Sequence, residues 1–382
     1  MASGRLRVVY LDHCAQLSGA ELAMARLLPA LAADVEAHVL LGEDGPLVAR
    51  LEAAGVSTEV LPMAEAARGL SRNRVRPGRL PGASMGHTAH YVATVARRLH
   101  RLRPDLVHTN SLKANVYGSV AGNLARVPVV WHARERLADD YLPPAAIRMV
   151  RAMVRHLPAA VIANSESTRE GLDSPGVAIT VIPSPVHVKA VARPRPPGSP
   201  LRIGMVGRLA PSKGQHVFLD AFATAFPDGP EQAVVVGGAL FGEESYEEAL
   251  RQQVARLGLG DRVELTGFRE DVSDELGGLD VLVHASLITE GFGQVVVEGM
   301  AAGLAVVAAA AGGPLEFITD GHDGLLYPTG DVEALAGALR RLAADRGLRE
   351  QLGEAARRRA RNFTPEVVAA QVLEVYRDTT RR

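Results

Sequence analysis

Two cations directly follow an apolar run in the segment Gly204–Lys213, which reads GMVGRLAPSK. The apolar residues predict a β-strand that ends at Gly207, and Arg208 and Lys213 come next. Ligands of open α/β sheets bind beyond the carboxyl ends of the strands, where a glycine lets the backbone approach a phosphate. This pattern indicates a phosphate site, and two solvated cations on a loop are the structural alternative.

A second pattern places Glu290 and Glu298 on either side of a glycine turn and a predicted helix start. The N–H groups of such a turn and the positive end of the helix can hold a pyrophosphate. Glu298 is then placed to accept hydrogen bonds from a ribose, and Glu290 to face a sugar beyond the phosphates. Acidic residues also favour helix starts for electrostatic reasons alone, but the coincidence with the cationic motif favours a ligand site. The turn consists of Gly291, Phe292 and Gly293.

The first half of the chain carries weaker signals. Gly19 opens a predicted helix and can receive an anion there, while Ser18 and Glu21 fit a capping box equally well. His132 closes a predicted strand, where an imidazole in a cleft can donate a hydrogen bond to a sugar hydroxyl. His108 has the same position on another strand, and lone histidines are more often structural.

Short β-branched runs alternate with longer helical segments, which predicts an α/β protein with parallel sheets covered by helices on both faces. The stretch 183–200 holds six prolines and predicts an interdomain linker. We expect a first domain at 1–186, a linker at 187–200, a second domain at 201–364 and a final helix within 365–382. The expected strands are Arg7–Leu11, Ala37–Leu41, Ser57–Leu61, Leu106–Thr109, Val129–His132, Ala159–Ala163 and Ile179–Ile182, then Leu201–Val206, Gln232–Val236, Arg262–Leu265, Val281–Ala285, Ala305–Ala309 and Gly324–Tyr327.

Three segments depart from this alternation. Pro62–Gly86 lacks periodicity and is expected to be a long surface loop. Its five arginines, between Arg68 and Arg79, fit either a solvated loop or contacts with an anionic acceptor. After Gly330 we expect helix only, from Val332 through Arg361, followed by Pro365–Asp378.

The composition of the chain argues against several classes of function. The 382 residues suffice for two domains, and 42 basic against 43 acidic residues give no sign of a nucleic-acid-binding surface. The single cysteine, Cys14, cannot form an intramolecular disulfide or a cysteine-based zinc site. The apolar run Val8–Leu11 is too short for a signal peptide or a membrane span, so we expect a cytoplasmic protein with at most peripheral membrane contact. The oligomeric state leaves no signal in the sequence.

The motifs together resemble those of the retaining GT-B glycosyltransferases of glycosyltransferase family 4, over nearly the whole chain. Val281–Gly330 is similar to the family's donor signature, GRLAPSKGQHVFLDAF to its phosphate-binding strand, loop and helix, and ANSES at Ala163–Ser167 to a feature of its first domain. Departures at Pro183–Pro185 and Ala285–Thr289 leave the subfamily open. The resemblance implies two Rossmann-like, doubly wound parallel-sheet domains that face a cleft, with the acceptor bound mainly by the first and the donor by the second.

The implied reaction transfers a sugar from a UDP- or GDP-sugar to a small-molecule, glycan or lipid-linked acceptor, with retention of the anomeric configuration. The final helix would cross back to the first domain. The strand end at Gly267–Arg269 is a place for the nucleotide base, which gives Arg269 a part in donor binding. The resemblance further implies that Arg208 and Lys213 neutralise the diphosphate, that Glu298 binds the ribose, that Glu290 contacts the transferred sugar, that Gly19 approaches the phosphate from the first domain and that His132 lies near the donor sugar.

No metal or other cofactor is expected, because two cations and helix N–H groups can stabilise the leaving diphosphate and no carboxylate pair for Mg²⁺ stands out. Two alternatives are a nucleotide-sugar-binding protein without turnover and a nucleotide-sugar epimerase of similar fold. A dehydrogenase is disfavoured because no G-x-G-x-x-G opens either domain.

Overall fold

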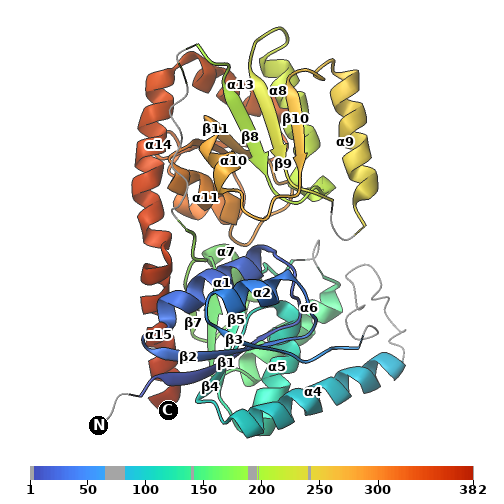
Figure 1. The fold of residues 1–382 in the computed structure, drawn as a ribbon, viewed down its shortest axis with the longest axis vertical. Helices are drawn as coiled ribbons and strands as arrows, with labels where there is room; N and C mark the ends of the chain where they lie inside the picture. Colours follow the sequence, from blue (N-terminus) through green and yellow to red (C-terminus); the bar gives the residue numbers. More distant parts are fainter. Residues whose placement is uncertain are drawn as a thin grey trace. The chain divides into compact units, whose positions relative to one another are not determined.

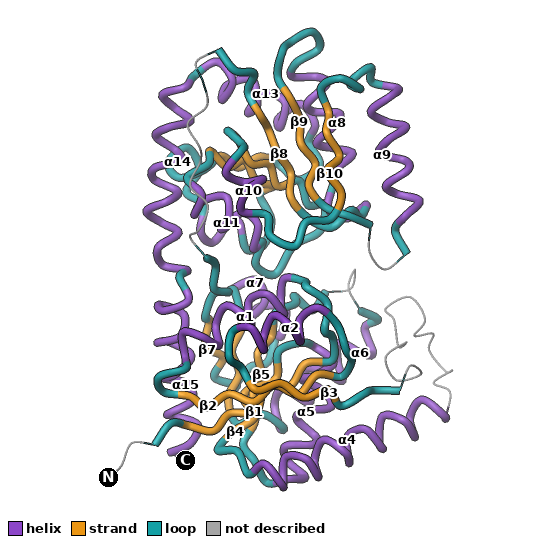
Figure 2. Tube along the Cα trace, viewed as in Figure 1, coloured by secondary structure: helices purple, strands orange, loops and turns teal. Residues whose placement is uncertain are grey.

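The computed structural model describes residues 4–64, 82–138, 142–187, 196, 198–239 and 242–381. The chain forms two compact units. Unit 1 comprises Met1–Pro185 together with Pro365–Arg382, and unit 2 comprises Val186–Thr364. In each unit a sheet lies between helices, as the strands and helices in Figures 1 and 2 show.

The unit 1 sheet has the strand order β3-β2-β1-β4-β5-β6-β7, and each neighbouring pair is parallel. Its elements are β1 (Leu6–Asp12), α1 (Gly19–Leu31), β2 (Val35–Leu41), α2 (Pro46–Ala53), β3 (Ser57–Val60), α4 (Gly82–Leu102), β4 (Leu106–Thr109), α5 (Leu112–Ala125), β5 (Val129–Ala133), α6 (Pro144–His156), β6 (Ala160–Ala163), α7 (Glu166–Leu172), β7 (Ile179–Val181) and α15 (Pro365–Arg381).

Both faces of this sheet are buried, as expected for parallel strands between helical layers. In β1, Val8 and Tyr10 pack with α1, α2 and α15, whereas Val9 and Leu11 pack with α4 and α5 on the other face. The strand period of two thus divides the apolar residues between two cores. Val372 of α15 is fully buried among the side chains of α1, which ties the last helix to the first strands.

The unit 2 sheet has the order β10-β9-β8-β11-β12-β13 and is parallel throughout. Helices α8, α9 and α13 contribute to the core on one face, and α10 and α11 to the core on the other. The elements are β8 (Arg202–Val206), α8 (Gln215–Ala225), β9 (Gln232–Val236), α9 (Glu244–Arg256), β10 (Val263–Gly267), α10 (Ser273–Gly277), β11 (Val281–His284), α11 (Gln294–Ala302), β12 (Ala305–Ala309), α12 (Pro314–Phe317), β13 (Leu325–Tyr327), α13 (Val332–Ala344) and α14 (Arg346–Ala360).

The predicted strands are all present, so the expectation of two doubly wound parallel sheets is confirmed. Two boundaries differ from the prediction. The region Val332–Arg361 is helical as expected, but it is divided at Asp345, whose carboxylate accepts a hydrogen bond from Leu348 N at 2.9 Å and so begins a second helix. The expected loop Pro62–Gly86 ends earlier, because α4 begins at Gly82.

The arginine-rich segment Arg68–Arg79 lies outside the described residues, as does most of the stretch 187–200. No helix in the described part of the chain is both long enough and apolar enough to cross a membrane.

Candidate functional site

The two charged motifs meet at the carboxyl edge of the unit 2 sheet. Strand β8 lies between β9 and β11, so the chain leaves β8 toward one side and leaves β11 toward the other. Loops that diverge in this way mark a topological switch point, where open α/β sheets bind their ligands. The β8–α8 loop carries Arg208 and Lys213, and the β11–α11 loop carries Glu290.

These two loops are packed backbone against backbone. Gly214 has φ +76°, and a Cβ atom added there would lie 2.0 Å from the carbonyl oxygen of Ala285. The N–H of Leu287 donates to the carbonyl oxygen of Ser212 at 2.8 Å. Gly207, with φ +152°, is open: a Cβ there would meet no described protein atom within 4 Å. The pattern thus supplies one glycine for close loop packing and one for open space at the strand end.

Lys213 and Glu290, which the sequence assigns to different parts of a ligand, form an ion pair with each other. Lys213 Nζ lies 2.6 Å from Glu290 Oε1, and the Glu290 side chain is only 14% exposed. His284, at the end of β11, places Nε2 at 3.4 Å from the same oxygen. Burial raises the pKa of Glu290, but Lys213 and then His284 outweigh burial and hold that pKa well below its ordinary value.

Arg208 stands on the same loop in a different environment. Its guanidinium Nη1 lies 3.7 Å from Glu243 Oε1 and its side chain is 29% exposed. Gln215 Nε2 donates to the Arg208 carbonyl oxygen at 2.9 Å, which fixes the backbone from which the side chain extends. Arg208 therefore offers a half-exposed cation on an anchored loop.

The glycine turn predicted to hold a pyrophosphate is anchored by its central side chain. Phe292 is 6% exposed and packs against Phe317 and Phe363 at ring-centroid distances of 5.4 and 6.0 Å. Gly293, with φ +79°, caps the N-terminus of α11 and follows Gly291 in the turn. Any contact of this turn with a ligand would therefore come from its backbone N–H groups, because the Phe292 ring belongs to the core.

Two further predicted site residues already have protein partners. Gln294 Nε2 donates to Glu298 Oε1 at 3.1 Å within α11. Arg269, after β10, donates from Nε to Glu275 Oε1 at 2.8 Å. The preceding residue, Phe268, is an exposed aromatic side chain at the same strand end.

In unit 1, Gly19 is the first residue of α1, as predicted. The capping box is not formed. Ser18 is the N-cap but makes no side-chain bond to the helix backbone; its hydroxyl donates to the Glu21 carboxylate instead. Glu21 is almost fully buried, and burial, followed by the charge of Asp12, raises its pKa to about 8.

His132 lies near the end of β5 and its imidazole is fully buried; its predicted contact with a donor sugar stays a prediction. Its Nδ1 lies 3.1 Å from Nε2 of His108, which is equally buried. Burial and then the charge of Arg134 lower the pKa of His108 to about 3, and the same two causes, with His108 itself, hold the pKa of His132 well below its ordinary value. Both rings are therefore neutral.

Sequence reasoning missed the polar cluster around these histidines. Buried Asp12 accepts hydrogen bonds from Asn110 Nδ2 at 2.7 Å and from Ser111 Oγ at 2.8 Å. Arg134 Nε donates to Asn110 Oδ1 at 2.7 Å. Strands β1 and β4 form the switch point of this sheet. Asp12 ends β1, Asn110 and Ser111 are the first two residues after β4, and Arg134 directly follows β5. The signal that could have identified these residues, and His284 in unit 2, is a polar side chain at the carboxyl end of a predicted parallel strand.

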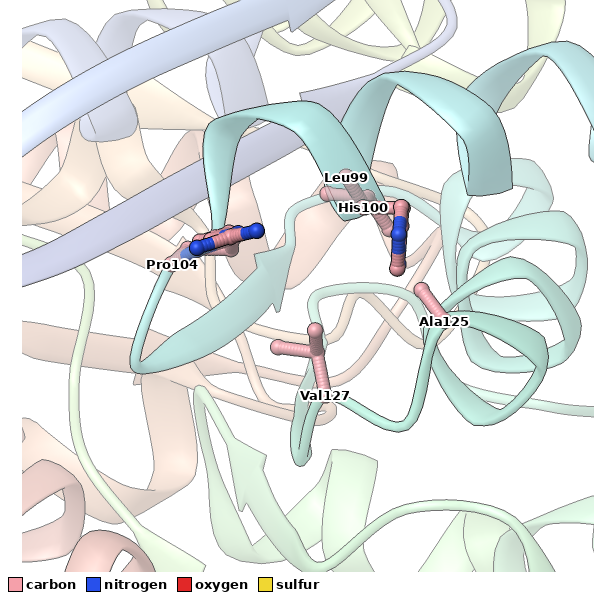
Figure 3. A pocket seen from close by; sticks show the side chains of 6 residues that line it. Leu99, His100, Pro104, Ala125 and Val127 are labelled. Carbon is pink, nitrogen blue, oxygen red and sulfur yellow. The ribbon is translucent and has the colours of Figure 1, made fainter.

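The pocket drawn in Figure 3 lies elsewhere in unit 1. It has a volume of about 200 Å³ and is lined by residues that precede β4 and β5, at the amino edge of the sheet. None of the predicted site residues belongs to it. The lining residues are Leu99, His100, Arg103, Pro104, Ala125 and Val127.

Comparison with known proteins agrees with this architecture. The family model described as Glycosyltransferase Family 4 matches residues 17–190, and the model described as Glycosyl transferases group 1 matches residues 189–359. A D-inositol 3-phosphate glycosyltransferase of Streptomyces bingchenggensis is 30% identical over 308 residues, which cover 72% of this chain and 67% of the relative. The crystal structure of Anabaena Alr3699/HepE in complex with UDP-glucose has a TM-score of 0.85 and 28% identity, covering 98% of this chain and all of that one.

An exopolysaccharide phosphotransferase of Streptomyces coelicolor, SCO2592, is 35% identical over 191 residues, but the chain spans only 20% of that protein. Two doubly wound parallel-sheet units, together with these neighbours, define the GT-B class of fold. Within that class, the chain belongs to glycosyltransferase family 4.

Proposed function

We propose that the protein transfers a sugar from a nucleoside diphosphate sugar to an acceptor with retention of anomeric configuration, and that unit 2 binds the donor without a metal ion. The observation that carries this proposal is the Lys213–Glu290 ion pair at the switch point of β8 and β11. A cation and a carboxylate on adjoining loops suit a donor that has a diphosphate next to a sugar. The HepE structures contain UDP, UDP with glucose, or UDP-glucose, which favours a UDP-sugar over a GDP-sugar.

Departure of a nucleoside diphosphate builds negative charge on the β-phosphate while the sugar becomes electron-poor. Lys213 and the half-exposed Arg208 would stabilise that charge, which is the role of preorganised cations in group transfer. The Lys213 ammonium would bind the phosphate, either in place of Glu290 or while still in contact with it. The Glu290 carboxylate would then orient the sugar hydroxyls. His284 would keep this carboxylate ionised as the lysine moves.

The remaining residues fit a donor laid along the carboxyl edge of the unit 2 sheet. Gly207, Gly291 and Gly293 would supply backbone approach to the diphosphate, with the Phe292 ring anchoring the turn. Glu298 would bind the ribose, whose hydroxyls would replace Gln294 as hydrogen-bond donors to the Glu298 carboxylate. The exposed Phe268 and its neighbour Arg269 would lie against the base. In unit 1, Gly19 would approach the phosphate and His132 the donor sugar. The acceptor and a cytoplasmic location also stay predictions.

A panel of ligands tests donor binding without knowledge of the acceptor, because a ligand that binds the folded state raises its melting temperature by mass action. We expect UDP-glucose or another UDP-sugar to raise Tm, UDP to do so nearly as well, and UMP to do so least. A panel in which no nucleoside diphosphate or nucleotide sugar moves Tm would contradict the proposal.

Turnover is then measured as donor hydrolysis or transfer, by release of nucleoside diphosphate and by the anomeric configuration of the product. We expect activity to persist in EDTA, because the cations on the two loops would take the place of a metal. Loss of activity in EDTA with recovery on Mg²⁺ or Mn²⁺ would contradict the metal-free mechanism. Nucleotide binding without product would indicate a binding protein, and a changed sugar still attached to its nucleotide would indicate an epimerase.

A further inference from the structure

A chain of buried polar contacts connects the last helix of unit 1 to the edge of its sheet. Tyr376, on α15, places its hydroxyl 2.8 Å from His108 Nδ1, and His108 Nε2 lies 3.1 Å from His132 Nδ1. Tyr10 OH lies 2.9 Å from Tyr376 OH, and all four of these residues are fully buried. Arg134 Nη2 completes the chain at 3.5 Å from His132 Nδ1.

The groups at the two ends of this series of contacts favour one set of tautomers. A guanidinium can only donate, so the contact with Arg134 Nη2 favours the lone pair on His132 Nδ1. The contact between the two rings then favours the proton on His108 Nε2. His108 Nδ1 is therefore an acceptor, and Tyr376 donates to it.

At the His132 end of this series of contacts, one N–H donor has no partner among the described residues. With Nδ1 as the acceptor, the proton of neutral His132 sits on Nε2, and that atom is buried without a hydrogen-bond partner among the described residues. A buried unpaired N–H is unfavourable, so its retention points to a partner that arrives with a ligand. Lowered pKa values keep both imidazoles neutral, as this arrangement requires.

We propose that Tyr376 and His108 act together with Arg134 as positioning residues that hold His132 as the Nε2–H tautomer, so that this N–H can donate to a sugar hydroxyl during transfer. The proposal rests on the proposed function only in its last clause, since the tautomer is a property of the free protein. The C-terminal helix would thus act on the reaction through two imidazole rings.

The first experiment reads the tautomers directly. Protein labelled with ¹⁵N-histidine gives two-bond ¹H–¹⁵N correlations that differ between the two tautomers, and the signals are assigned with His132→Gln and His108→Gln. We expect both rings as Nε2–H in the unmodified protein. In Tyr376→Phe we expect His108 to gain the Nδ1–H form, whereas in Tyr10→Phe it should not. A His132 ring protonated on Nδ1 in the unmodified protein would overturn the proposal.

The two tyrosines also form a matched pair for kinetics, because each variant deletes one buried phenol hydroxyl from the same hydrogen bond. Tyr376→Phe removes the donor to His108 and should lower kcat about tenfold with the KM for the donor nearly unchanged, the loss expected for one hydrogen bond of moderate strength. Tyr10→Phe leaves that donor in place and should keep kcat close to normal. Equal losses in the two variants would mean that the contacts serve folding only.

A second pair covers the case in which Tyr376→Phe folds poorly. His108→Gln retains a side-chain N–H for His132, whereas His108→Leu does not, so kcat should be higher in the glutamine variant at matched thermal stability. Equal kcat values in the two would refute a positioning role. If the tautomers behave as expected but neither the unmodified protein nor any variant transfers sugar, the proposed function is wrong. The positioning of His132 by Tyr376 and His108 would still hold.

Discussion

Glu290 shows how one neighbour decides the charge of a buried group. Burial alone would favour the protonated acid, but the ammonium of Lys213 at 2.6 Å reverses that preference. In the proposed reaction the lysine turns to the arriving phosphate, and His284, whose Nε2 lies 3.4 Å from the same oxygen, stays beside the Glu290 carboxylate. This arrangement makes the effects of single substitutions in the site asymmetric.

Replacement of Glu290 with glutamine should lower kcat roughly 100-fold, as removal of one preorganised charged group commonly does, while affinity for UDP stays unchanged or increases. The increase would follow because Lys213 loses its internal competitor. Initial rates and isothermal titration with UDP measure the two effects. Arg251→Ala, which breaks an exposed pair with Glu247 on α9, is the control and should change neither. A parallel loss of UDP affinity in Glu290→Gln would remove the carboxylate from the sugar and assign it to the phosphates.

Replacement of Arg208 or Lys213 with alanine should weaken UDP binding and slow transfer, by about 2–4 kcal/mol of transition-state stabilisation. UMP, which lacks the β-phosphate, should lose much less affinity. Titrations of each variant with UDP and UMP give this ratio. If both nucleotides lost affinity alike, the cations would not be reading the diphosphate.

The sequence identified the charged residues of this site but not their pairing. Spacing places Lys213 after one strand and Glu290 after another, and strand order, which no local pattern reveals, brings the two strands together. His284 and Arg134 were missed for a different reason: a single polar residue at a strand end is common, and its neighbours come from distant segments. His132 was placed on the right strand, but its burial depends on packing that a single strand does not reveal.

The site in unit 2 depends on how closely the β8–α8 and β11–α11 loops can approach each other. Gly214 allows the β8–α8 loop to lie against Ala285, and the added Cβ of any other residue would overlap that carbonyl oxygen. The strands themselves were predictable, because each is a short β-branched run between helical segments. The break between α13 and α14 was not predictable, because the helical pattern continues past Asp345, whose extended backbone ends the first helix and whose carboxylate caps the second.

Gly214→Ala should therefore destabilise the protein by at least about 1–3 kcal/mol, since it forces both a left-handed alanine and a steric clash. UDP affinity should fall with it. Gly337→Ala is the matched control: that glycine lies inside α13 with open space around it, and alanine there should stabilise the helix by about 0.5–1 kcal/mol. Urea unfolding of both variants compares them. A neutral Gly214→Ala would mean that the loops separate without loss.

Buried titratable groups in unit 1 affect the stability of the protein in opposite directions as the pH changes. His108 stays neutral in the folded state down to a pKa of about 3, so the unfolded chain binds protons first and stability falls as pH drops below about 6.5. His132 acts in the same direction. Glu21, with a folded pKa near 8, stays protonated while the unfolded chain ionises, so stability falls as pH rises from about 4.5 to 8.

The free energy of unfolding, measured in urea from pH 5 to 9, should separate these contributions. His108→Gln should make the acidic side shallower by up to about 1.4 kcal/mol per pH unit, the value for one proton. Glu21→Gln should flatten the dependence on the other side instead. His156→Gln, at an exposed position on α6, is the control and should leave the curve as it is. Superimposable curves for all three variants would contradict the burial of these groups.

Unit 1 takes its core from both ends of the chain, with Val372 and Tyr376 of α15 set among residues of β1 and α1. On the ribosome, the first strands therefore emerge long before the helix that covers them, and about 180 residues of unit 2 are made in between. Unit 2 is continuous in sequence and can complete its core during synthesis. Unit 1 can complete its own only after α15 has been made and has left the exit tunnel. Every nascent chain thus passes through a stage in which unit 2 is complete while the part of the unit 1 sheet that α15 covers is still exposed, and a stop codon before α15 would leave the chain at that stage.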